Sequence, residues 1–344
     1  MIPAKNRGLQ AILIIFSTYA VAMLFTYIVA ILVDAPFTLW FKDTPLILLA
    51  TLIFIVVFGI VWDGLLISVG LTCQTWRRWN PSPGSVLVSV ESMRRIRFFS
   101  CGLSPLLMIA ATAFVILGTS NITLLSLKLL GTATHWRDAF FWGMEGSIIE
   151  RLTQLPVRVA AWDKLYHSAW GIELFAAFVL VLLGRGPRII LHFCLSLILL
   201  FYVGRFIGLV NPVMGPAFFR PELFGYLDGS ATNTAMQLVS GVMSQSPEQA
   251  MERGGVLLGG VSAMPSLHVA MVAVTSYWLA AAKRWTMYIT VPWVLLVWTS
   301  TVVLGWHYIL DGAGGIALGA ACIWSAHRVL RGWGKGEQTR NTSN

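Results

Sequence analysis

Eight runs of apolar residues, each long enough to cross a lipid bilayer, recur along this chain of 344 residues. A membrane-spanning helix needs about 20 mostly apolar residues. The runs cover residues 11–33, 46–72, 98–119, 168–184, 188–210, 264–282, 285–305 and 307–326. Only 11% of the residues are charged, whereas a soluble domain carries about a quarter. The sequence therefore predicts an all-α integral membrane protein. Its first run is too long for a signal peptide and lacks a cleavage site, so we expect it to remain as an anchor.

The basic residues predict the orientation of these spans. With the N-terminus inside, the inside segments are 1–10, 73–97, 184–188, 283–284 and the tail after 326. They hold 15 of the 24 Lys and Arg residues but only two of the 15 acidic residues, Glu91 and Glu337. Lys and Arg concentrate in cytoplasmic loops, so both termini are expected in the cytoplasm. The net charge of +9 then reflects membrane topology and gives no reason to expect nucleic-acid binding.

Two long segments are expected on the outer side. Residues 120–167 combine apolar and charged residues on a helical period and are rich in tryptophan. This pattern favours an amphipathic segment lying in the membrane interface, although a surface helix packed on the bundle fits equally well. Residues 211–263 form an outer loop rich in Gly, Pro, Ser and Met.

The chain is expected to have three regions. Residues 1–97 contain two membrane helices and the turn-rich cytoplasmic linker "RRWNPSPGS". Residues 98–327 form a six-helix membrane domain, and residues 328–344 a basic cytoplasmic tail. The four cysteines show neither metal-ligand spacing nor a disulfide framework; they are Cys73, Cys101, Cys194 and Cys322.

Histidine and carboxylate side chains converge on the outer ends of the last three spans. His268 begins one span in "SAMPSLHVA", and His307 and Asp311 lie in "LGWHYILD" at the same predicted face. On a helix, residues four apart share one side, so Asp311 can fix the tautomer of His307 and leave its other nitrogen as a nucleophile. His268 has no sequence-local partner and is free to donate a proton. Ser266 lies at a predicted helix N-terminus, which favours an anion such as phosphate.

Simpler interpretations of these residues remain open. An isolated histidine in a span is also compatible with a packing role, and His-x3-Asp occurs by chance in many helices. Ionisable groups within a membrane are nevertheless usually functional. Their convergence at one membrane face favours a reactive site.

Two motifs carry a family resemblance. The sequence "PSLH" at 265–268, followed by "STVVLGWHYILD" at 300–311, resembles the second and third motifs of the type-2 phosphatidic acid phosphatase superfamily. The general pattern there is Pro-Ser-Gly-His, then Ser-Arg-x5-His-x3-Asp. With Leu267 for Gly and Thr301 for Arg, this chain is similar to the branch that contains fungal inositol phosphorylceramide synthase and its bacterial relatives. The resemblance covers about residues 120–327 and implies a six-helix core bundle with two additional N-terminal helices.

The resemblance implies roles for the matching residues. His307 attacks phosphorus and forms a phosphohistidine, Asp311 orients it, and His268 protonates the leaving oxygen. Ser266 and Thr301 help to bind the phosphoryl oxygens. No metal or other cofactor is expected. The implied substrates are a lipid phosphate or phospholipid and either water or a hydroxyl acceptor.

The first motif of that superfamily, Lys-x6-Arg-Pro, matches only in part. Arg220 and the proline after it fit its second half, but Val213 stands where Lys is expected. A developing phosphoryl charge needs cations, so we expect Arg205 and Arg220 to bind phosphate, with Arg253 as a further candidate. Alternatively, Arg205 pairs with Glu173, and Arg220 caps the loop.

Further polar residues lie before the fourth span, where they line a headgroup pocket or form a solvated interfacial face: Asp163, Lys164, Tyr166 and His167.

The leading function is a lipid phosphotransferase or phosphatase of the bacterial inner membrane, with an extracytoplasmic active site. The departures at Leu267 and Thr301 favour the transferase branch over a phosphatase that uses water. A transporter with Asp63, Glu173 and Arg205 along a polar path is an alternative, but the chain shows no internal repeat. A third alternative is a non-catalytic membrane protein that binds a partner and keeps the histidines for a structural role.

Overall fold

A computed structural model describes residues 4–79, 103–130, 136–184, 187–253 and 262–331, which are predominantly helical. The α-helices are α1 (Ala4–Leu32), α2 (Thr44–Trp79), α4 (Leu103–Leu117), α5 (Ser120–Leu130), α6 (Asp138–Thr153), α7 (Val159–Gly184), α8 (Pro187–Val210), α9 (Pro216–Phe219), α10 (Ala231–Met243), α11 (Pro247–Arg253), α12 (Leu267–Ala282), α13 (Met287–Val303) and α14 (Ile309–Val329). The predicted linker RRWNPSPGS begins within the last turn of α2, and its remaining residues from 80 onward, like the tail after residue 331, lie outside the described residues.

The described part of the chain contains seven helical segments that are long and apolar enough to cross a membrane. They are Gly8–Leu32, Thr44–Val69, Ser104–Leu130, Val159–Leu183, Pro187–Val210, Arg284–Val303 and Ile309–Val329. The sixth predicted span, 264–282, is the shorter apolar helix α12. The prediction of an all-α integral membrane fold is therefore confirmed.

Helices α8 and α12 form the centre of the bundle. Helix α8 packs against α4, α12 and α14, and α12 packs against α7, α13 and α14. Large side chains such as Phe178, Leu191 and Leu200 are fully buried between them. The N-terminal helices α1 and α2 pack on α4 from outside, and most of their large apolar side chains are exposed, as suits lipid-facing helices.

Two span boundaries differ from the prediction. The third span continues through α5 to Leu130, because the side chains of Asn121, Thr123 and Ser126 are buried and hydrogen-bonded inside the protein. Asn121, for example, donates to the carbonyl oxygen of Thr38 at 2.8 Å. Helix α7 begins at Val159, so residues 159–167 are its first turns and are continuous with the predicted fourth span.

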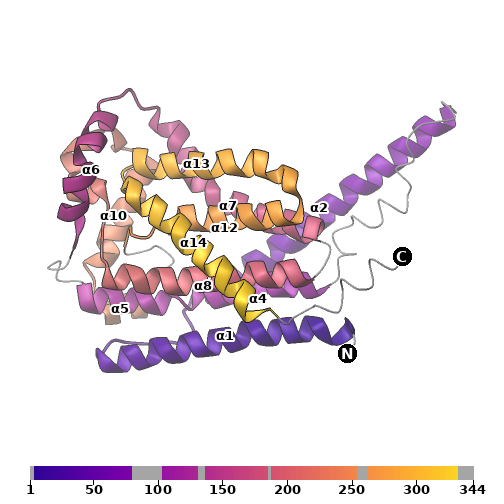
Figure 1. Cartoon of the computed structure of the whole chain (residues 1–344), viewed down its shortest axis with the longest axis horizontal. Helices are drawn as coiled ribbons and strands as arrows, with labels where there is room; N and C mark the ends of the chain where they lie inside the picture. Colours follow the sequence, from indigo (N-terminus) through magenta and orange to yellow (C-terminus); the bar gives the residue numbers. More distant parts are fainter. Residues whose placement is uncertain (1–3, 80–102, 131–135, 185–186, 254–261, 332–344) are drawn as a thin grey trace.

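Helices α6 and α10 occupy one end of the bundle. They run across the ends of the long helices, at the end opposite to the start of α1 (Figure 1). The loops that precede α12 and α14 reach the same end. This end of the molecule therefore gathers the segments that carry His268 and His307.

Candidate functional site

His307 lies in a tight turn between α13 and α14. Helix α13 ends at Val303, and Gly305 then adopts a positive φ of 71°, which only glycine adopts without strain. The N–H groups of Trp306 and His307 both donate to the carbonyl oxygen of Thr301, at 3.0 and 3.2 Å. These two backbone hydrogen bonds therefore fix the position of His307 before helix α14 begins.

The expectation that His307 and Asp311 share a helix is wrong, although they are close together. Helix α14 starts only at Ile309, with extended Tyr308 as its N-cap. Asp311 turns back and its Oδ2 accepts the N–H of Tyr308 at 2.8 Å, which is a capping-box contact. The same Oδ2 lies 3.6 Å from Nδ1 of His307, and the Asp311 side chain is fully buried. Capping geometry, and not helical periodicity, brings the pair together.

The PSLH segment joins this turn from the side of α12. Ser266 is the N-cap of α12, and its Oγ accepts the N–H of Val269 at 3.4 Å. Its own N–H donates to the carbonyl oxygen of Asp311 at 2.9 Å. The ring of His268 lies 6.3 Å from the ring of His307, centroid to centroid. The predicted convergence of these three segments is present.

His268 has partners that are distant in sequence. Its Nε2 accepts a hydrogen bond from Nε1 of Trp170 at 3.0 Å, and its Nδ1 lies 3.5 Å from the hydroxyl of Tyr166. A nitrogen that accepts a hydrogen bond carries no proton. To act as an acid, His268 must therefore take a second proton on Nε2 and displace the Trp170 N–H.

Both histidines line a cavity of about 410 Å³ at this end of the bundle. Aliphatic and aromatic side chains make most of its wall, and the aromatic ones include Tyr166, Trp170 and Trp306. The ring of Tyr166 stacks on the indole of Trp306 at 5.7 Å. The cavity therefore combines two imidazoles with broad apolar surfaces, which suits a lipid more than a free ion.

The loop that contains the partial first motif is bound to the His307 turn. Gly215 has φ of 112°, and a Cβ atom there would collide with the carbonyl oxygen of Trp306. The N–H of Ala217 donates to the carbonyl oxygen of Gly305 at 3.0 Å. Val213, at the position of the expected lysine, is fully buried in an apolar cluster with Tyr308 and Phe141. The chain thus uses an apolar anchor at that position.

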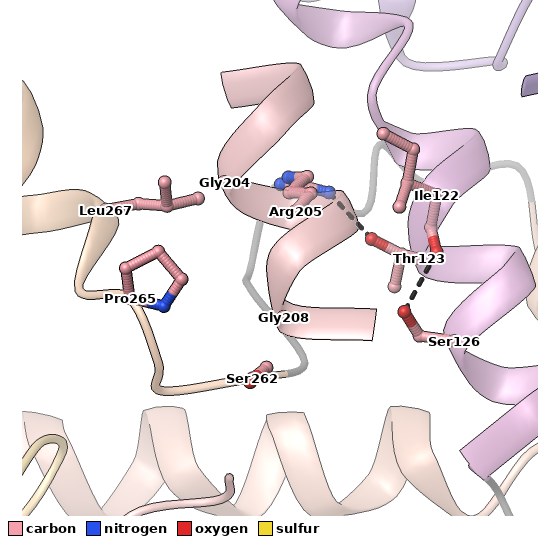
Figure 2. Close-up of a pocket in the computed structure, with 9 residues that line it drawn as sticks. All are labelled: Ile122, Thr123, Ser126, Gly204, Arg205, Gly208, Ser262, Pro265 and Leu267. Carbon is pink, nitrogen blue, oxygen red and sulfur yellow. Dashed lines mark hydrogen bonds between the residues drawn. The ribbon is translucent and has the colours of Figure 1, made fainter. Parts of the chain in front are cut away.

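Arg205 lies beside the cavity but points away from it. Its Nη1 donates to Oγ1 of Thr123 at 2.7 Å and to the carbonyl oxygen of Thr119 at 3.2 Å. Figure 2 shows Arg205 directed toward α5, while Leu267 points at Gly204 from the opposite side of α8. Leu267 borders both the Arg205 pocket and the larger cavity. The Leu that replaces the usual Gly therefore stands between Arg205 and the histidines.

The other predicted phosphate-binding residues also lie off the cavity wall, as far as the described residues define that wall. Arg220 is half exposed, forms an ion pair with Glu222 at 3.4 Å, and lies over the ring of Trp142 at 5.7 Å. Thr301 is buried, and its hydroxyl donates to the carbonyl oxygen of Trp298. Its carbonyl oxygen holds the His307 turn. Arg253 ends α11 and is exposed.

Two carboxylates on α6, which the sequence analysis missed, support the site. Glu145 accepts the N–H groups of Ile309 and Leu310 at 2.6 and 2.8 Å, and so caps α14. Asp138 accepts the N–H groups of Met214 and Gly215 at 2.8 and 2.9 Å. Burial raises the pKa of both carboxyl groups, while these backbone donors lower it. The seven-residue spacing, which places both acids on one side of a helix, was the signal available in the sequence.

The polar residues before the fourth span have separate places. His167 and Tyr166 line the cavity. Asp163 accepts the N–H groups of Ala231 and Thr232, and thereby holds the start of α10. Its Oδ1 also lies 4.0 Å from Nε2 of His167. Lys164 is exposed. The headgroup-pocket interpretation therefore fits two of the four residues.

Glu173 lies deeper in the membrane part of α7. One of its carboxylate oxygens accepts a hydrogen bond from Nε1 of Trp293 at 3.3 Å. It borders a separate, mainly apolar cavity between α7, α12 and α13.

Comparison with known proteins agrees with this geometry. The family model described as PAP2 superfamily matches residues 134–325, which include α6, both histidines and Asp311. No curated protein and no solved structure matches the chain. Because the family model covers more than half of the sequence, the chain belongs to the PAP2 superfamily.

Proposed function

We propose that the protein is a lipid phosphotransferase that acts through a phosphohistidine at His307. The observation that carries the proposal is the placement of His307 and His268 on one cavity, with Asp311 held 3.6 Å behind His307. Membership of the PAP2 superfamily supports phosphatase or phosphotransferase chemistry.

The first step transfers a phosphoryl or phosphodiester group to the enzyme. Asp311 faces Nδ1 of His307, so Nε2 is the nitrogen that attacks phosphorus. The bond from phosphorus to the leaving oxygen breaks, and His268, protonated on both nitrogens, gives that oxygen a proton. The buried carboxylate of Asp311 then stabilises the positive charge on the phosphorylated ring.

The second step releases the group to an acceptor. A hydroxyl oxygen attacks phosphorus, the bond between phosphorus and nitrogen breaks, and neutral His268 takes the hydroxyl proton. Water and an alcohol occupy the same attacking position. The Leu267 and Thr301 departures and the apolar cavity wall favour an alcohol. The positive-inside pattern supports an extracytoplasmic position for this site, and the proposed location of the chain is a bacterial inner membrane. The chemistry requires no metal.

The products of purified protein distinguish transfer from hydrolysis. The enzyme is given a panel of lipid phosphates and phospholipids in EDTA, with and without inositol or ceramide, beside His307→Ala. A new phosphodiester that forms only with acceptor and only with His307 supports the transferase. Free phosphate that depends on His307 in every condition would instead identify a phosphatase. Turnover that survives His307→Ala would overturn both assignments.

A further inference from the structure

Helix α6 has two contrasting faces. Asp138, Phe141, Glu145 and Ile149 are buried against the His307 turn and its surroundings. On another side, Phe140, Met144 and Ile148 are 65%, 46% and 48% exposed. Residues four apart lie one above the other on a helix, so these three side chains form a continuous apolar strip, here called the α6 stripe.

The place of α6 in the fold indicates what covers this stripe. The helix runs across the ends of the long helices (Figure 1). A helix that crosses the ends of membrane spans lies parallel to the membrane plane, near the depth of the lipid headgroups. Amphipathic helices at that depth bury their apolar face by about 5–10 Å at the boundary between headgroups and acyl chains.

Charge on α6 fits the same partner. Arg137 and Arg151 stand seven residues before and after Met144, and both are exposed. This spacing places them on the side of the stripe, where their guanidinium groups reach lipid phosphates while the apolar side chains enter the acyl region. Glu150 is six residues after Met144, which places it about 120° away around the helix, and it is an exposed charged residue beyond the stripe.

The buried face of the same helix holds the reactive turn. Glu145 caps α14 at Ile309 and Leu310, the second and third residues after His307. Asp138 binds the backbone of Met214 and Gly215, and the hydroxyl of Tyr308 donates to it at 3.3 Å. Bonds from backbone N–H groups to a carboxylate are charge-assisted and about twice as strong as neutral ones.

We propose that α6 lies in the outer lipid leaflet with the α6 stripe inserted among the lipids. On the buried face of the same helix, Glu145 and Asp138 then act as positioning residues for His307. The proposal rests on the proposed function, because it takes His307 as the nucleophile. It makes the lipid surface part of the support of the active site.

The position of the helix is tested first, in reconstituted vesicles. Met144→Cys and Glu150→Cys are made in a background whose four native cysteines are replaced by alanine, and each is labelled with an environment-sensitive fluorophore. Vesicles of phosphatidylcholine and phosphatidylglycerol contain acyl chains with or without bromine, a quencher. The label at position 144 should be quenched by the brominated chains about twice as strongly as the label at position 150. Equal quenching, or none at position 144, would show that α6 is not seated in lipid.

The positioning role is tested by kinetics in the same vesicles. Glu145→Gln places an amide donor against one of the two N–H groups, so kcat should fall about tenfold or more while KM stays within about twofold. Glu145→Asp keeps the charge and should recover part of kcat. The matched control Glu150→Gln, on the exposed edge of α6, should behave as wild type. Equal kcat for Glu145→Gln and Glu150→Gln would overturn the positioning role.

A parallel assay of His307→Ala separates this inference from the proposed function. If His307→Ala is inactive and Glu145→Gln has normal kcat, only the inference fails. If His307→Ala is active, the proposed function fails, whatever the fluorescence shows.

Discussion

The backbone N–H of Ser266 donates a hydrogen bond to the carbonyl oxygen of Asp311 at 2.9 Å. This bond joins the two segments that carry His268 and His307, although Ser266 and Asp311 are 45 positions apart in sequence. It requires α12 and α14 to approach closely, and Gly315 allows this approach. A Cβ atom at Gly315 would lie 2.4 Å from the carbonyl oxygen of Ser266.

Gly315→Ala should therefore destabilise the protein and separate the two histidines. Because the colliding atom is backbone, the helices must move, at a cost of about 1–3 kcal/mol. We expect a lower apparent unfolding temperature and a lower kcat. Gly171→Ala is the matched control, since a Cβ atom there meets nothing within 4 Å. If the two variants had the same unfolding temperature and kcat, the close approach would not matter.

Asp311→Asn should impair chemistry more than stability. The amide oxygen can still accept the N–H of Tyr308 and preserve the cap. The charge that faces His307 at 3.6 Å is lost, so kcat should fall roughly a hundredfold or more. Steady-state kinetics and thermal unfolding of the same preparation measure both effects. A variant with wild-type kcat would remove Asp311 from the mechanism.

Arg220→Ala should have little effect on turnover, in contrast to the role expected from the first motif. The guanidinium is half exposed and is engaged by Glu222 and Trp142 outside the cavity. Exposed ion pairs contribute about 0–1 kcal/mol, so kcat/KM should stay within about threefold of wild type. A larger loss, measured with the same lipid substrate, would mean that Arg220 moves into the cavity when substrate binds.

Asp138 should make stability fall as pH rises through the acidic range. Burial raises the pKa of this carboxyl above its ordinary value of 3.8. The folded protein then holds the proton more tightly than the unfolded chain. The contribution of Asp138 to folding stability is therefore fully present below its ordinary pKa and is lost as pH rises through the raised pKa. Asp138→Asn should flatten this part of the curve. Apparent unfolding temperatures between about pH 3.5 and 6.5 provide the test, and an unchanged slope in the variant would contradict it.

Hydropathy predicted the membrane fold well because each span is determined locally. Its errors occurred where polar residues are bonded inside the protein. Asn121 and Thr123 suggested the end of a span, yet both are buried partners of distant groups, Thr38 and Arg205. A sequence window does not contain such partners.

The site was predictable in part for the same reason. The predicted alternating directions of the spans bring His268 and His307 to one end, so their meeting followed from the predicted topology. The capping turn of Asp311 could not be predicted from topology, because Tyr308 is not a usual N-cap residue. The carboxylate of Glu145 was equally hidden, since it is more than 160 residues from the backbone that it binds. The orientation of Arg205 was not predictable either, since its guanidinium donates to Thr119 and Thr123, which are more than 80 residues away.

The most direct test of the central claim is to trap the enzyme during turnover. Purified protein is mixed with a 32P-labelled lipid phosphate, quenched with alkali within milliseconds to seconds, and digested for peptide mapping. The account predicts an alkali-stable, acid-labile label on the peptide that contains His307, and its absence in His307→Ala. Steady turnover without any such label, together with an active His307→Ala variant, would contradict it.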